Sequence, residues 1–361
     1  MHIRSSRHLA LLSLLALLLT LAATGGHATF GQTPQRPTAE ASLHNPTFDN
    51  HRWYEFNDRY GHYLTGSWLP DDDVDAPLSS RQDWRLWFMD GWGIPEFDPS
   101  AEHADSVEAV VMRNYGETDN LLAGLYQIIY GTTPCLTYEF SMKAHARPGS
   151  GDSLIAIQVG IDRLGWHLPT DDPAVHESFP ASTVWGTAKQ PLWNYQTLSV
   201  RAEALAEQIT VFTYAHADGG RSINIYFDTG SFSDVTPARI YDPSGYAQTS
   251  GIDGLDASVG GTSATISWNS TAAGISQVYY RAVAQPITTT TTLSHTIYLP
   301  LVASTGMWQA SALDKSYTTA HAITLSSLES GRTYEYFVVT RGVENDACTD
   351  WVSEKKTFTV P

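Results

Sequence analysis

Alternating hydrophobic and polar residues recur in short runs along most of the chain. Clear examples are residues 122–130, 136–144, 154–161 and 208–215, which have the two-residue period of strands with one buried face. Stretches rich in Gly, Pro and Ser separate these runs, and such residues form the turns between strands. Residues 198–208 contain several Ala and Glu, but their alternation also favours a strand. Because helical periodicity is weak, the pattern predicts an all-β protein built from sandwiches or jelly rolls.

A second set of strand patterns follows residues 236–251, a stretch with the composition of a linker. The strands predicted in this set are residues 262–268, 276–283, 321–325, 333–340 and 356–360. Trp268 has the phase of the buried face in the first of them. We therefore expect two domains, at residues 43–235 and 252–361.

The N-terminus has the organisation of a secretory signal peptide. Arg4 and Arg7 precede the apolar run of residues 9–23, and small residues follow it. The run has about 15 residues, fewer than the roughly 20 that a membrane-spanning helix needs. We expect residues 1–28 to be removed and residues 29–42 to be a disordered leader, which leaves a secreted or cell-surface protein without a membrane span. An uncleaved N-terminal anchor is the alternative.

The chain is acidic, and this narrows its partners. Its 38 Asp and Glu outnumber its 21 Lys and Arg, and removal of two arginines with residues 1–28 changes the net charge from −17 to −19. Such a charge repels nucleic acid and anionic lipid, which argues against both as partners. The two cysteines, Cys135 and Cys348, fall in different predicted domains, so we expect no disulfide between them. Neither Cys nor His residues have the spacing of a zinc site.

Tryptophans supply the candidate ligand-binding residues. Eight of the eleven lie in the first predicted domain, and their faces suit stacking on the apolar C–H faces of sugar rings. The densest group is Trp84, Trp87 and Trp92, and we expect at least one of these rings to be exposed. Trp166 lies in a second predicted loop, where binding residues concentrate. For each ring, the alternative is a place in the core.

Four short motifs connect the first domain to a known family. They are NPTFD from Asn45, GLYQ from Gly124, VGID from Val159 and IYFD from Ile225. With these motifs, residues 43–235 resemble the jelly-roll carbohydrate-binding modules related to families 4, 9 and 22, which have a galactose-binding-domain-like fold. The resemblance implies that the partner is a polysaccharide or cell-surface glycan.

The same resemblance implies a metal ion. Such modules often carry a structural Ca²⁺ held by an acid after the N-terminal Phe and an acid near the last strand. In this sequence those positions are Asp49 and Asp228. Carboxylate oxygens are ligands that Ca²⁺ prefers, and ligands from both ends of the domain would fix its termini together. The alternative is that both acids are solvated or cap turns.

The second domain also resembles a known family. Leu328 and Tyr334 are six residues apart across a Gly-containing turn, which resembles the tyrosine corner of fibronectin type III domains. In that corner the phenol hydrogen-bonds back to the backbone. With the strands around Trp268 and residues 356–360, the resemblance covers about residues 252–361 and implies an immunoglobulin-like β-sandwich.

A Thr-rich insertion at about residues 285–306 departs from the fibronectin pattern. It contains five consecutive threonines, Thr288 to Thr292, followed by the apolar run Ile297 to Val302. We expect a long surface hairpin. The alternative is an exposed strand that pairs with a partner edge or anchors the protein to the envelope.

These patterns favour binding over catalysis. The sequence has no nucleophile-elbow, phosphate-loop or dinucleotide motif, and no two carboxylates can be paired from it as a glycosidase requires. We expect a secreted, non-catalytic protein whose first domain recognises glycan and whose second domain is a spacer or docking unit. The alternative is a structural or adhesive envelope protein that contacts envelope proteins without binding sugar. An enzyme accessory domain or hydrolase fragment is a third, weaker interpretation.

Overall fold

Strands make up almost all regular structure in the described part of this protein. The computed structural model describes residues 41–43, 54–57, 63–66, 84–89, 95–100, 102–104, 109–114, 120–148, 155–166, 174–175, 178–190, 193–217, 223–284 and 306–361. Within these ranges the one helical element is a short 3-10 helix at Pro243–Gly245. No helix among them is long and apolar enough to cross a membrane. The prediction of an all-β protein is confirmed.

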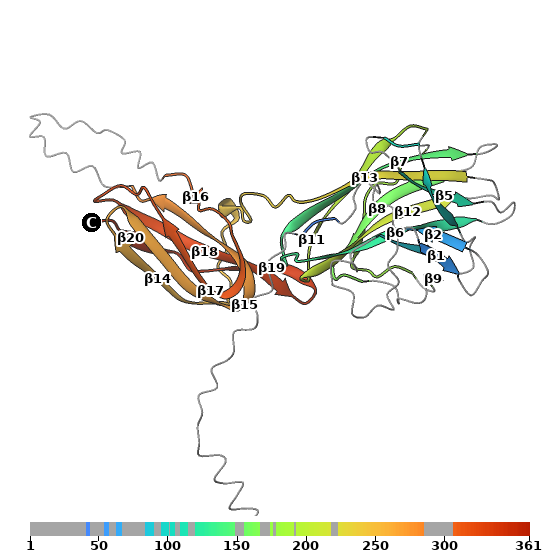
Figure 1. Cartoon of the computed structure of the whole chain (residues 1–361). Coiled ribbons are helices and arrows are strands. Elements are labelled where there is room, and N and C mark those ends of the chain that lie inside the picture. Colours follow the sequence, from blue (N-terminus) through green and yellow to red (C-terminus); the bar gives the residue numbers. More distant parts are fainter. Residues whose placement is uncertain are drawn as a thin grey trace, which may run out of the picture. The chain divides into compact units, whose positions relative to one another are not determined.

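Two sheets form the first part of the fold (Figure 1). The six-stranded sheet has the order β10 (Thr183–Trp185), β8 (Ile155–Asp162), β12 (Gln208–Ala217), β6 (Leu121–Tyr130), β3 (Arg85–Met89) and β9 (Ala174–Val175). The five-stranded sheet has the order β11 (Gln196–Glu203), β7 (Thr137–Pro148), β13 (Ile223–Asp234), β5 (Ala109–Asn114) and β4 (Glu96–Ser100). A separate hairpin pairs β1 (Tyr54–Asn57) with β2 (Tyr63–Gly66). All pairings are antiparallel except that of β3 with β9.

Alternating residues bring the two sheets together as a β-sandwich, called here the N-terminal sandwich. Along β11, Leu198, Val200 and Ala202 are buried, whereas the residues between them are exposed. Phe140 of β7 and Ile157 of β8 belong to the same hydrophobic cluster as these three residues. The two-residue period therefore separates a core face from a solvent face on the same strand.

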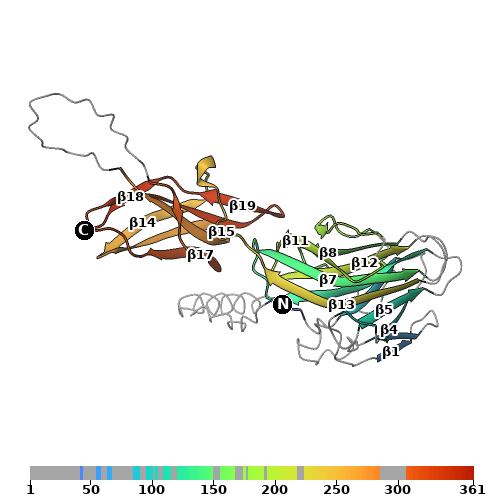
Figure 2. The same ribbon diagram turned by 90° about the horizontal axis from the view of Figure 1, so that it is seen from above.

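Within residues 252–284 and 306–360, seven strands form one sheet, called here the C-terminal sheet (Figures 1 and 2). Its strands are β14 (Ile252–Gly260), β15 (Ser263–Ala282), β16 (Gln309–Ala310), β17 (Asp314–Leu325), β18 (Thr333–Glu344), β19 (Ala347–Val352) and β20 (Lys356–Thr359). The sequence predicts two strands where β15 is a single long one. Its first half pairs with β14 and β17, and its second half pairs with β18.

Two predicted features of this sheet are present. Trp268 is buried, and its indole N–H donates to the Thr340 hydroxyl oxygen over 2.9 Å. The Glu329 N–H donates to the Tyr334 hydroxyl over 3.0 Å, which is the return hydrogen bond that the corner spacing predicts. The insertion predicted at residues 285–306 lies outside the described residues apart from Gly306.

The segment predicted as a linker, residues 236–251, is bound along the C-terminal sheet. The Ile240 N–H donates to Gln277 Oε1 over 3.2 Å, and the Tyr241 N–H donates to the Tyr279 hydroxyl over 2.9 Å. Further along, the Tyr246 hydroxyl donates to the Ser353 carbonyl over 2.9 Å. Hydrogen bonds to the sheet, rather than Gly- and Ser-rich flexibility, therefore determine its path.

The two cysteines form a disulfide, contrary to the expectation from sequence. Cys135 and Cys348 have a Cα–Cα distance of 5.6 Å and are separated by 213 residues. Cys135 lies in the turn between β6 and β7, and Cys348 lies in β19, just after a tight turn at Asn345 and Asp346. Both turn residues have positive φ, which suits a two-residue hairpin turn. The hairpin of β18 and β19 thus carries Cys348 to the N-terminal sandwich.

Candidate functional site

The tryptophan group predicted to bind ligand is mainly structural. Trp84 is 2% exposed and Trp87 is 0% exposed, so neither ring has a face open to a ligand. Trp84 packs between the sheets near Phe140, with ring centroids 6.2 Å apart. Trp87 lies in an aromatic cluster on the other side of the six-stranded sheet. Trp84 and Trp87 therefore do not supply the exposed ring, and Trp92 lies outside the described residues, so the expectation of at least one exposed ring in this group stays a prediction.

Trp166 lies at the margin of the same aromatic cluster and is half-buried. Its ring contacts Phe179 and Phe212, with centroid distances of 5.6 and 6.0 Å. The buried Asp162 fixes the loop, because its Oδ1 accepts hydrogen bonds from the N–H groups of Leu164 and Trp166. Trp166 therefore has a fixed position and an incompletely covered ring.

Of the two predicted Ca²⁺ ligands, only Asp228 is described; Asp49 lies outside the described residues. Asp228 is fully buried at the end of the regular part of β13, before a bulge. Its Oδ2 accepts from the Ala104 N–H over 2.6 Å, and its Oδ1 accepts from the N–H of Thr229 over 2.6 Å. Within the described ranges, no group of three or more His, Cys, Asp or Glu residues is arranged to hold a metal ion. The Asp228 carboxylate thus holds the backbone of Ala104 and Thr229 in place.

One exposed tryptophan is not among the ligand-binding residues predicted from the sequence. Trp193 is 61% exposed on the segment that leads into β11. Two residues later, Tyr195 contacts His145 edge-to-face, with ring centroids 4.3 Å apart. The signal in the sequence was Pro191 followed by Trp193 and Tyr195 just before an alternating strand pattern. An aromatic residue placed at the entry to a strand with polar outward positions suits ligand binding.

A row of rings crosses the outer face of the five-stranded sheet beside this segment. His145 of β7 stacks on Tyr226 of β13, with a centroid distance of 4.3 Å and an interplanar angle of 3°. Residues 102–104 are tied down over this row, because the Tyr195 hydroxyl donates to the Glu102 carbonyl over 2.8 Å. Tyr195, His145 and Tyr226 therefore form a fixed and largely buried aromatic row, and Tyr195 lies two residues after Trp193 in the chain.

Charged groups complete the row. The Glu102 carboxylate lies 2.9 Å from His145 Nε2, without hydrogen-bond alignment, and 2.6 Å from the Arg147 guanidinium. Burial lowers the pKa of His145, and the neighbouring carboxylate of Glu102 offsets this only in part. Burial, with the nearby carboxylates of Asp228 and Glu102, raises the pKa of Tyr195. At neutral pH the row therefore contains a neutral imidazole and neutral phenols.

Beyond the aromatic row, polar side chains cover the outer face in three cross-strand rows. The rows follow from the register of β11, β7 and β13. We call the following residues the outer strip: Thr197, Ser199 and Arg201 of β11, Glu139, Ser141 and Lys143 of β7, and Ser231 and Ser233 of β13. From its first to its third row the strip extends about 13 Å, at roughly 3.3 Å per residue.

Paired groups organise the outer strip. Arg201 contacts the Glu139 carboxylate over 2.8 Å, and its side chain is 66% exposed. The hydroxyls of Ser141 and Ser231 are 2.8 Å apart. Hydroxyl, carboxylate and guanidinium groups held side by side offer both donors and acceptors to a hydroxyl-rich ligand. No catalytic arrangement is needed for such recognition.

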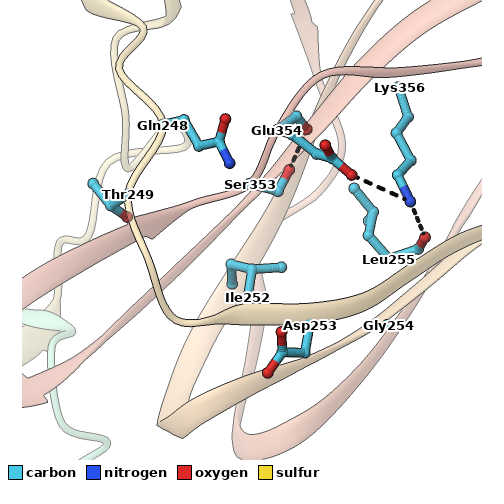
Figure 3. Close-up of a pocket in the computed structure, with 9 residues that line it drawn as sticks. All are labelled: Gln248, Thr249, Ile252, Asp253, Gly254, Leu255, Ser353, Glu354 and Lys356. Atoms are coloured by element: carbon cyan, nitrogen blue, oxygen red, sulfur yellow. Dashed lines mark hydrogen bonds and ion pairs between the residues drawn. The ribbon is translucent and has the colours of Figure 1, made fainter.

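A small pocket in the C-terminal part is a weaker candidate (Figure 3). It has a volume of about 240 Å³, and Figure 3 shows Lys356 between Glu354 and Leu255 at one side of it. The Lys356 ammonium donates to the Leu255 carbonyl over 2.8 Å and lies 3.4 Å from the Glu354 carboxylate. The pocket is smaller than the roughly 300–1,000 Å³ of most ligand sites, and its cation is already satisfied.

Comparison with known proteins gives similarity only at the level of solved structures. No protein-family model matches the chain. No curated protein matches it either. The adhesin domain of Epf from Streptococcus pyogenes matches with 12% identity and a TM-score of 0.32, over 82% of this chain and 87% of that one.

Carbohydrate-binding modules are also among the similar structures. CBM61 in complex with beta-1,4-galactotriose matches with 11% identity and a TM-score of 0.28, over 42% of this chain and 88% of that one. The CBM22-1–CBM22-2 tandem of Xyn10C from Paenibacillus barcinonensis matches with 12% identity and a TM-score of 0.29, over 76% and 93%. At these values the likenesses show neither a family nor a function for this chain.

Proposed function

We propose that the protein is a secreted, non-catalytic glycan-binding protein. In this proposal residues 43–235 are a carbohydrate-binding-module-like jelly roll that binds a polysaccharide or cell-surface glycan. Residues 252–361 are a fibronectin type III-like spacer or docking domain, joined through residues 236–251. The observation that carries the proposal is the exposed Trp193 on the segment that leads through Tyr195 into β11, the strand that carries part of the outer strip.

Recognition would combine two kinds of contact. Trp193 offers an apolar ring, and a sugar ring presents apolar C–H faces that stack on such a surface. The Arg201 and Glu139 pair and the serine hydroxyls offer charge-assisted and neutral hydrogen bonds to hydroxyl groups. The side chains of the outer strip stand on strands of a packed sheet, so little order is lost on binding.

The disulfide supports secretion. Disulfides form and persist in oxidising compartments and are rare in the cytosol. Both cysteines of the chain are used in the single bond between Cys135 and Cys348. Together with the signal-peptide pattern of residues 1–28, this favours export of the protein.

The glycan proposal is tested on an array of polysaccharides and cell-surface glycans. We expect the intact protein to bind at least one glycan class, and Trp193→Ala to weaken that binding by about tenfold or more, as for loss of a stacked ring. Met307→Ala is the matched control, because Met307 is 88% exposed but lies in the C-terminal part. Absence of glycan binding, with self-association or binding to envelope proteins retained, would favour the structural or adhesive alternative instead.

A structural Ca²⁺ at Asp49 and Asp228 is a separate part of the proposal. The support is the motif resemblance, and the test is the melting temperature with Ca²⁺ and with a chelator. A higher melting temperature in Ca²⁺ that is lost in Asp49→Asn supports the ion. Identical melting in both conditions contradicts it. Asp49→Asn is the better variant, because Asp228 already anchors the backbone of Ala104 and Thr229.

A further inference from the structure

Among the described residues, a disulfide and two ion pairs connect the N-terminal sandwich with the C-terminal sheet, in addition to apolar packing. The disulfide joins Cys135 and Cys348. In the first ion pair the Arg341 guanidinium lies 3.2 Å from the Glu203 carboxylate. The second ion pair is between Lys315 of β17 and Asp234 at the end of β13. Of these three contacts, one is covalent and two are ionic.

The covalent contact is enclosed on the side of Cys135, whereas Cys348 is only partly buried. Cys135 is fully buried, and its N–H donates to the Ala204 carbonyl over 2.8 Å. Cys348 Sγ lies 3.9 Å from the same carbonyl oxygen. The chain just after β11 therefore packs against the sulfur atoms, and opening of this region gives a reductant fuller access to them.

The Glu203 contact lies one residue from that carbonyl. Arg341 holds Asp350 with two hydrogen bonds, of 2.7 and 3.1 Å, and extends the same guanidinium to Glu203. Arg163 contacts Glu203 from the sandwich side, donating to its carbonyl over 2.8 Å. The Arg341 and Glu203 side chains are about one quarter to one third exposed, at 24% and 32%, so solvent screens this pair less than a fully exposed one.

We propose that these contacts form an oxidation-dependent clamp between the N-terminal sandwich and the C-terminal sheet. The clamp closes when the two thiols lose two protons and two electrons to a small-molecule or protein disulfide, which is reduced to two thiols. Once closed, the Arg341–Glu203 pair keeps the region around Ala204 shut and shields the bond from reductants. The clamp does not depend on what the outer strip binds.

The test measures disulfide reduction in the intact folded protein. Mass spectrometry of an unreduced digest is expected to find the Cys135 and Cys348 peptides linked. Glu203→Gln removes the ion pair while leaving the Arg341–Asp350 contact in place. We expect this variant to be reduced by a small thiol about tenfold faster than the wild type, because opening costs less free energy.

Glu139→Gln is the control. It removes a carboxylate of β7 that pairs with Arg201 within one sheet, and it should leave the reduction rate unchanged. Two free thiols in protein prepared under oxidising conditions would overturn the clamp. Equal reduction rates for wild type and Glu203→Gln would overturn the shielding role of the ion pair. Arg341→Gln repeats that comparison from the other side of the pair.

Discussion

The indole nitrogen of Trp87 donates a hydrogen bond to the carbonyl oxygen of Thr213, 3.0 Å away and 126 residues distant in sequence. Trp87 lies on β3 and Thr213 on β12, and both strands flank β6. The bond crosses β6 at Gly124, where a Cβ would come within 2.0 Å of the Thr213 oxygen. The bare backbone of Gly124 thus leaves room for this contact.

Gly124→Ala is therefore expected to be strongly destabilising. The added methyl group meets backbone on one side and the indole nitrogen of Trp87 at 2.9 Å on the other, so the sheet must shift. We expect a loss of about 3 kcal/mol in the free energy of unfolding, as for severe overpacking. Urea unfolding measures it. Gly260→Ala is the control, since a Cβ there meets nothing within 4 Å, and a loss as large in the control would contradict this account.

Tyr334→Phe should weaken the C-terminal sheet. The change removes the hydroxyl that accepts from the Glu329 N–H and leaves that N–H without its partner. We expect a loss of about 1–2 kcal/mol in the free energy of unfolding. Chemical denaturation followed by tryptophan fluorescence measures it. Tyr280→Phe should change stability little, because the Tyr280 hydroxyl makes no hydrogen bond to the described residues.

Stability is expected to fall between pH 7.5 and pH 5.5, in part because of His321. This ring is buried against Trp268, with centroids 5.0 Å apart, and its Nε2 lies 3.1 Å from the Ser270 hydroxyl. Burial lowers the pKa of His321, and Asp314 offsets this only in part. Below the unfolded-state pKa of about 6.5, the unfolded chain therefore binds more protons than the folded one, which favours unfolding.

His321→Phe tests this pH dependence. The variant keeps a ring against Trp268 but cannot bind a proton, so its loss of stability on going from pH 7.5 to pH 5.5 should be smaller. The variant should still lose some stability between pH 7.5 and pH 5.5, because burial also lowers the pKa of His145 beside Glu102 and Arg147. Unfolding free energies at both pH values provide the measurement. A loss in the variant equal to that in the wild type would remove His321 from the explanation.

A substitution in the outer strip tests its hydrogen bonds to a glycan without changing the ring of Trp193. Ser199→Val replaces an exposed hydroxyl at the centre of the strip by two methyl groups and suits a strand. Glycan affinity should fall by about three- to tenfold, as for one lost hydrogen bond, without loss of stability. Thr324→Val is a matched control on β17, where the exchange also lies on a strand. Equal effects of both variants on glycan binding would contradict a role of the outer strip in that binding.

The sequence predicted strands well where one face is buried. In β11, the alternation of Leu198, Val200 and Ala202 with polar residues is the pattern that predicts the strand. The prediction failed at β15, where residues 269–274 are small or polar and interrupt the alternation of hydrophobic and polar residues. There the strand continues with shifts in register, because the neighbouring strands of the sheet hold its backbone. Tertiary pairing, which local patterns do not encode, decides such cases.

The candidate site was harder to predict because burial of a ring is a tertiary property. Trp87 and Trp193 look alike in sequence, yet Phe179 and its neighbours pack on Trp87, and Trp193 remains exposed. The disulfide escaped prediction for a related reason. Its formation depends on a hairpin of β18 and β19 that carries Cys348 to the N-terminal sandwich, and no spacing in the sequence specifies that contact.

Strand β11 links the two proposals mechanically. It carries Thr197, Ser199 and Arg201 of the outer strip and ends at Glu203, next to the carbonyl that contacts both cysteines. A tensile load applied between an attached surface and residues 252–361 therefore runs through a sulfur–sulfur bond in parallel with the backbone of residues 236–251. That bond would keep the two parts joined even if the hydrogen bonds along residues 236–251 were broken.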